Sequence, residues 1–190
     1  MPAASLLTAA VASLAFGQAP TATVFSVDTA ASTLTYAIVH KLHKVAAESR
    51  EVEGKAALTS DGKVQVQVRA PIRSFKSGDA NRDSHMEEVL ETSKHSHVTF
   101  KGVGQLTAPA SFPAVTEVTL QGQLEFHGRK RAENVPVKVE WASATEARVK
   151  ASFSVSLDAY EVERPSLLFI KIEDGCTVGV DVAVKAAPAK

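Results

Sequence analysis

The chain has 190 residues, a length that suits one domain with a substantial core. Its 21 Lys and Arg residues balance 21 Asp and Glu residues, so it has no net field that would attract a nucleic acid or an anionic membrane. Cys176 is the only cysteine, which excludes an internal disulfide. We interpret it as a buried apolar thiol, because Val178 and Val180 share its strand parity.

The N-terminal segment has the composition of a secretory leader. The first 27 residues contain no Lys, Arg, His, Asp or Glu, residues 6–16 form a mostly apolar run, and small residues follow at Gly17 and Ala19. This pattern predicts a signal peptide over residues 1–19 and one mature domain over residues 20–190, in the periplasm or secreted. The run is too short to span a bilayer, so we expect no integral membrane segment in the mature chain.

The rest of the chain keeps a period of two in its apolar residues, which is typical of β-strands with one buried face. The clearest apolar rows are Leu34-Tyr36-Ile38, Val64-Val66-Val68, Leu120-Gly122-Leu124-Phe126, Val135-Val137-Val139-Trp141, Phe153-Val155-Leu157 and Cys176-Val178-Val180-Val182. With almost no helix to cover these rows, the sheet must pack on itself as a sandwich or a closed antiparallel barrel. A barrel of this size can hold a small apolar ligand.

Turn residues divide these rows into strands. Asp61-Gly62 and Asp174-Gly175 each predict a hairpin, and residues 127–131 predict a turn. Pro109 and Pro113 indicate a loop, since two prolines cannot sit in a central strand. The expected strands include residues 23–27, 33–42, 52–59, 63–72, 115–126, 132–141, 167–172 and 176–184.

Residues 77–97 break the strand period and favour a helix. Ser84 and Glu87 fit a capping box, and Asp79 suits a helix start. A short helix near residues 79–92 would lie across one barrel end or wall and turn one apolar face inward. That face would carry Met86, Val89 and Leu90.

The sequence offers no enzyme or metal signature. Strand parity sets His95 and His97 opposite Phe100, and His127 opposite Phe126, so the six histidines do not converge and we expect no metal and no cofactor. The acidic residues of the predicted helix more often cap it and solvate its outer face. No nucleophile elbow, P-loop or Gly-rich turn between a strand and a helix is present, so we expect no enzyme activity.

Arg129-Lys130-Arg131 forms a local basic cluster on a chain of balanced charge. Two interpretations stay open for it. It could be a solvated turn that keeps strand ends soluble. It could instead hold a phosphate or contact an anionic head group.

Several segments, in their order, resemble the YceI-like family of bacterial proteins. They are Phe25-Ser26-Val27-Asp28, Tyr36-Ala37-Ile38-Val39-His40, Arg82-Asp83-Ser84-His85-Met86, Val98-Thr99-Phe100, Leu120-Gln121-Gly122-Gln123-Leu124-Glu125-Phe126-His127-Gly128 and Phe153-Ser154-Val155-Ser156-Leu157-Asp158. The resemblance implies a mainly β protein, an extended antiparallel lipocalin-like barrel of about eight or more strands, exported to the periplasm. It also implies a lumen that accommodates a long isoprenoid or another amphiphile, and a binding protein rather than an enzyme.

The inward rows supply the candidate lumen residues. Their many valines fill less volume than leucine or phenylalanine would, which favours a cavity. The candidates are Tyr36, Ile38, Val66, Val68, Phe100, Leu124, Phe126, Val139, Trp141, Phe153, Val155, Val178 and Val180. For a polar head group the candidates are His40, Arg82 and His85.

We therefore predict a protein that sequesters or transports a long apolar or amphiphilic ligand, such as an isoprenoid or a fatty acid. Two other interpretations stay open. A solidly packed barrel would make this a structural protein whose outer face contacts a partner. An enzyme acting on an amphiphile would use His40 or His85. The sequence also leaves a homodimer open.

Overall fold

The computed structural model describes residues 21–40, 43–164, 166–167 and 170–186, so the predicted signal peptide lies outside the described residues. The strands are β1 (Ala22–Val27), β2 (Thr33–His40), β3 (His43–Ser49), β4 (Glu53–Thr59), β5 (Lys63–Pro71), β6 (His97–Gln105), β7 (Ala114–Phe126), β8 (Arg129–Trp141), β9 (Glu146–Ser156), β10 (Ser166–Leu167), β11 (Ile170–Lys171) and β12 (Gly175–Ala186). One α-helix, α1 (Ala80–Val89), and three short 3₁₀ turns, η1 (Thr29–Ala31), η2 (Ile72–Ser74) and η3 (Asp158–Tyr160), complete the described part.

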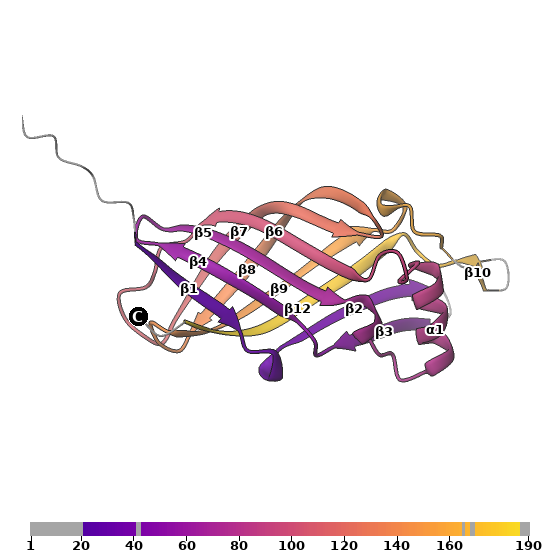
Figure 1. Ribbon diagram of the computed structural model, residues 1–190, viewed down its shortest axis with the longest axis horizontal. Coiled ribbons are helices and arrows are strands. Elements are labelled where there is room, and N and C mark those ends of the chain that lie inside the picture. Colours follow the sequence, from indigo (N-terminus) through magenta and orange to yellow (C-terminus); the bar gives the residue numbers. More distant parts are fainter. Residues whose placement is uncertain (1–20, 41–42, 165, 168–169, 187–190) are drawn as a thin grey trace, which may run out of the picture.

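Eight strands close into an antiparallel barrel, which confirms the predicted fold class (Figure 1). Their order is β1-β4-β5-β6-β7-β8-β9-β12, and β12 pairs back onto β1. Alternate side chains of each strand face inward, as the period of two requires, because successive residues point to opposite faces. The barrel is long, with α1 at one end and the start of β1 at the other (Figure 1).

The strand β12 has two partners along one edge. Near its end it pairs with β1, from Phe25 opposite Ala186 to Val27 opposite Val184. Its earlier residues pair with β2, which η1 separates from β1. The hairpin of β2 and β3 thus extends the wall toward α1. Within the described residues, the outer edge of β3 forms only one isolated β-bridge, between Glu48 and Lys76.

The helix α1 lies where the sequence predicts it, but its cap differs from the predicted capping box. The Asp79 carboxylate accepts hydrogen bonds from the backbone N–H groups of Asn81 and Arg82, at 3.0 and 3.1 Å. Asp79 is therefore the N-cap. Ser84 and Glu87 lie inside the helix, too far along the chain to satisfy its first free N–H groups.

Two strand predictions were wrong. The strand β3 was missed, because its sequence puts Ala46 on the outer face and Ala47 on the inner one and so shows little contrast. The predicted hairpin at Asp174-Gly175 does not form. Instead β11 pairs with β10, and β12 pairs with β9. The Asp174 carboxylate and carbonyl accept hydrogen bonds from the backbone N–H groups of residues 158 and 157, which ties this segment to η3.

Candidate functional site

The barrel encloses a cavity of about 620 Å³, which we call the lumen. This volume lies in the range of pockets that bind small molecules. Its wall consists mainly of inward-facing aliphatic and aromatic side chains. Eleven of the predicted lumen residues line it: Tyr36, Ile38, Val66, Val68, Phe100, Leu124, Phe126, Phe153, Val155, Val178 and Val180.

Val139 and Trp141, which the sequence predicts in the lumen wall, do not line the lumen. Both face inward, but they belong to the packed core at the barrel end opposite α1. The Trp141 ring meets that of Phe25 edge-on, with centroids 5.8 Å apart. Parity along a strand determines which face a side chain takes. It does not determine how deep along the barrel the cavity reaches.

The wall at the helix end comes from segments that strand parity does not describe. Met86 and Val89 of α1 and Leu90 at its C-cap line the lumen, as the predicted apolar face suggests. Ile72 of η2 and Phe75 just after it also line the lumen. Neither was a predicted lumen residue: Ile72 shares the parity of Val66 and Val68 but stands at the end of the predicted strand, and Phe75 lies beyond it.

Polar side chains reach the lumen from α1. Arg82 and His85 both line it, while the side chain of His40 lies outside the described part of the structure. The Arg82 guanidinium lies 3.7 Å from the Asp79 carboxylate. The neighbouring Asp83 carboxylate is buried and accepts hydrogen bonds from the Ser77 N–H and hydroxyl, at 2.9 and 2.6 Å. The Ser77 hydroxyl is the main cause that lowers the pKa of Asp83.

Two further ionisable groups line the lumen in their neutral forms. Burial raises the pKa of Tyr36 to about 12, and Cys176 and Asp83 add to the effect while Arg82 opposes it. Burial raises the pKa of the Cys176 thiol to about 11. Both shifts arise mainly because an apolar surrounding disfavours the charged form. The lumen is therefore an apolar compartment even where its wall carries hydroxyl and thiol groups.

One histidine outside the lumen, His127, packs into the barrel end. The His127 side chain is only 13% exposed, and its Nδ1 lies 3.0 Å from the Tyr160 carbonyl oxygen. The prediction of an outward, solvated His127 was therefore wrong, because a left-handed backbone conformation at this turn residue (φ 49°) carries the ring off the strand pattern. Within the described ranges, no group of three His, Cys, Asp or Glu side chains could hold a metal ion.

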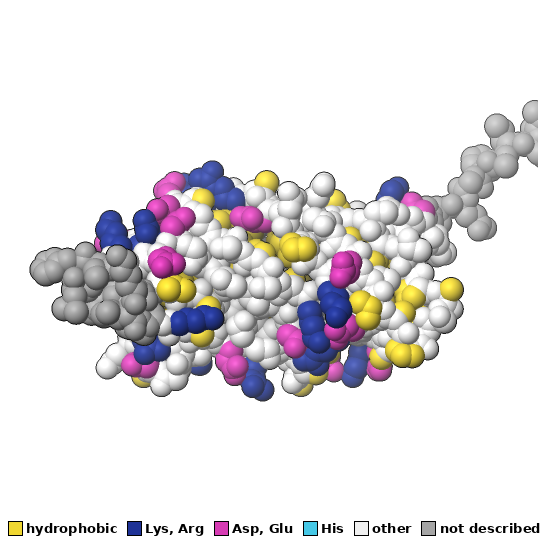
Figure 2. Space-filling view, turned by 180° about the vertical axis from the view of Figure 1, so that it is seen from behind, with side chains coloured by type: hydrophobic (Ala, Val, Ile, Leu, Met, Phe, Trp, Pro, Cys, Tyr) yellow, Lys and Arg dark blue, Asp and Glu magenta, His cyan; other side chains and the backbone are white. Residues whose placement is uncertain are grey.

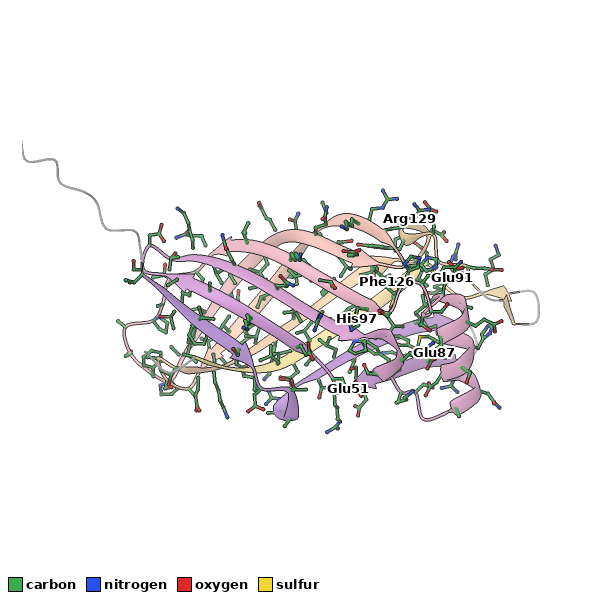
Figure 3. The ribbon with its side chains drawn as sticks, in the orientation of Figure 1. Glu51, Glu87, Glu91, His97, Phe126 and Arg129 are labelled. Carbon is green, nitrogen blue, oxygen red and sulfur yellow. The ribbon has the colours of Figure 1, made fainter. Side chains whose placement is uncertain are left out.

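The three basic residues 129–131 contact acidic side chains and a backbone carbonyl of the same chain. Arg129 forms an ion pair with Glu161, and Lys130 lies 3.5 Å from Glu125. Arg131 donates a hydrogen bond to the carbonyl of Ala159 at 2.9 Å. Figure 3 shows Arg129 beside Phe126 and Glu91 at the barrel end that carries α1. These contacts favour the interpretation of a turn that ties β8 to η3 over that of a phosphate site.

The YceI-like domain model matches residues 25–186, which is most of the chain. The chain belongs to the YceI-like domain family. Among curated proteins, none matches it. In the part of the chain that the structure describes, no helix is long and apolar enough to cross a membrane.

Solved structures of the same fold carry low sequence identity. A polyisoprenoid binding domain from Saccharophagus degradans has a TM-score of 0.71 and 19% identity, and the alignment covers 86% of this chain and 98% of that one. BcnA from Burkholderia cenocepacia has a TM-score of 0.65 and 16% identity, with 83% and 98% covered. A YCEI protein from Campylobacter jejuni has a TM-score of 0.61 and 9% identity, with 80% and 90% covered.

Proposed function

We propose that this YceI-like domain sequesters or transports one long apolar or amphiphilic molecule, isoprenoid or fatty-acid-like, inside the lumen. The observation that carries the proposal is the lumen itself, since a barrel that served only as a rigid scaffold would fill its interior with side chains. The fold shared with a polyisoprenoid binding domain supports the same ligand class. No catalytic step is needed for this role.

Apolar burial supplies enough free energy for such binding. A polyprenyl or fatty acyl chain offers several hundred Å² of apolar surface, which at about 25 cal/mol per Å² corresponds to on the order of 10 kcal/mol before the costs of ordering. The ligand's polar end would face α1, where Arg82 and His85 reach the lumen. Arg82 carries a permanent positive charge and suits an anionic or hydroxyl head group.

We also propose that this function is carried out in the periplasm or outside the cell. The support is the sequence of the first 19 residues, whose apolar run followed by small residues is typical of an exported protein. A long apolar ligand also needs a carrier in an aqueous compartment, because its exposed surface is costly in water. The test of location is the N-terminal residue of the protein isolated from its own cells.

A Val66→Trp substitution tests the lumen site. Val66 lines the lumen, so the indole would occupy ligand volume, and we expect uptake of linear prenyl alcohols and fatty acids to fall at least tenfold. Native mass spectrometry of the mature chain measures the bound ligand directly.

Val103→Trp is the matched control, because Val103 is 52% exposed on the outer face of β6. It should bind as the parent does. Equal binding by Val66→Trp and the parent, with both folded by circular dichroism, would place the ligand elsewhere. A parent that binds neither ligand series would favour the alternative of a structural protein.

A further inference from the structure

The lumen ends inside the barrel, well before the strands do. On β4, Ala56 lines it but Leu58 does not, and on β5, Val66 lines it but Val64 does not. On β8 the same change occurs between Val137 and its neighbour on the same face, residue 139. The cavity is therefore closed at the end that lies away from α1, and this boundary crosses several strands.

The boundary is a packed apolar layer, which we call the floor. Its members are Phe25, Leu58, Val64, Leu106, Val139 and Trp141, all less than a tenth exposed. The indole N–H of Trp141 donates a hydrogen bond to the Thr116 hydroxyl at 2.8 Å, and this bond fixes the ring that meets Phe25 edge-on. Close-packed interiors yield little to an entering chain, so the floor has a fixed position.

The two ends of the lumen differ in polarity. Arg82, His85 and Glu163 border it at the helix end. Lys55 and Arg69 also border it, but both are exposed residues of the outer surface. The floor carries no charged side chain, and a polar group placed there would lose its water without a charged partner.

We propose that the lumen admits its ligand tail first and that the floor sets the longest tail that can be buried. The ligand class is then a single-chain amphiphile with one polar and one apolar end, and chains that are polar at both ends are excluded. This inference rests on the proposed function and adds to it a length limit that the floor sets.

Trp141 is the only tryptophan, so its fluorescence reports contact between the ligand and the floor. Bromine quenches tryptophan only at short range. We expect a fatty acid brominated at its terminal carbon to quench Trp141 severalfold more than the same acid brominated beside the carboxyl group. Equal quenching, or the reverse order, with binding verified by native mass spectrometry, would overturn the tail-first orientation.

A series of fatty acids and a series of linear prenyl alcohols test the length limit. Affinity should rise by about fourfold for each added methylene of the fatty acids and stop rising once the tail reaches the floor. Val137→Phe should move that break to shorter chains, and Phe25→Leu should move it to longer ones. Val103→Phe, on the outer face, should leave it unchanged.

The outcomes separate the two proposals. Affinity that rises without a break, or a break that neither folded variant moves, would overturn the floor as a length limit while leaving lumen binding intact. A parent that binds neither series would overturn the proposed function, and the length limit with it.

Discussion

A single thiol on the inner face of β12 reports on the interior of the barrel. Cys176 lines the lumen, and its pKa of about 11 leaves a thiolate fraction about a hundredfold smaller than that of a thiol at the ordinary value of 9.0. We expect thiol reagents to modify the folded protein slowly at neutral pH, more slowly still with ligand bound, and rapidly in urea. Mass spectrometry follows the reaction. Fast labelling that ligand does not slow would place the thiol outside the lumen.

The two tyrosines predict an alkaline limit to stability. Burial is the main cause that raises the pKa of both Tyr36 and Tyr160, and the Tyr160 hydroxyl also donates a hydrogen bond to Glu133 at 3.1 Å. Folding therefore favours the neutral phenols, and this contribution to stability is lost as pH rises above the unfolded value near 10. Tyrosinate absorbance should stay low until about pH 12 or until the barrel unfolds. Ionisation of one equivalent near pH 10 in the folded protein would contradict this.

At the scale of elements, the start of α1 can be tested by mutation, because either Asp79 or the predicted Ser84–Glu87 capping box could begin the helix. Because the Asp79 carboxylate accepts two backbone N–H bonds, Asp79→Ala should lower the free energy of unfolding by about 1 kcal/mol. Ser84→Ala is the control, since Ser84 is exposed within the helix and alanine is a better helix former, so stability should be unchanged or slightly higher. Urea denaturation measures both. A larger loss for Ser84→Ala would restore the capping box as the helix start.

The local alternation of apolar residues predicted most of the strands, β3 excepted, but it did not predict which strands pair with one another. The rows through Val66 and Val178 alternate clearly, so their strands and inward faces could be predicted. The partners of β12 depend on pairings with residues far away in the sequence, which no local alternation encodes. The turn pair Asp174-Gly175 therefore predicted a hairpin that the longer β9 ladder replaces.

The sequence predicts which side chains face the inside of the barrel, but it does not predict how far along the barrel the lumen reaches. Every inward residue of β8 satisfies the same parity, yet Val137 lines the lumen and Trp141 belongs to the floor. Depth depends on strand tilt and on which large side chains meet across the barrel, and both are properties of the assembled sheet. The contribution of η2 and Phe75 to the wall has the same origin, since it follows from where β5 ends.

At the scale of the whole molecule, the exterior contrasts with the lumen. Charged side chains of both signs are interspersed over the outer face shown in Figure 2, with hydrophobic side chains scattered among them. Charged side chains also pair across neighbouring strands elsewhere on the exterior, such as Arg69 with Glu53 and Lys150 with Glu140, both at 2.8 Å. A polar exterior thus surrounds the apolar lumen.

The pairing of β1 with β12 determines when the barrel can form during biosynthesis. Phe25 lies opposite Ala186, so the ring of strands joins the first described strand to the last. A growing chain holds β1 for nearly the whole of translation before its partner exists, and contacts this far apart in sequence form slowly. The ring of strands therefore cannot close until residues 184–186 of β12 have been synthesised.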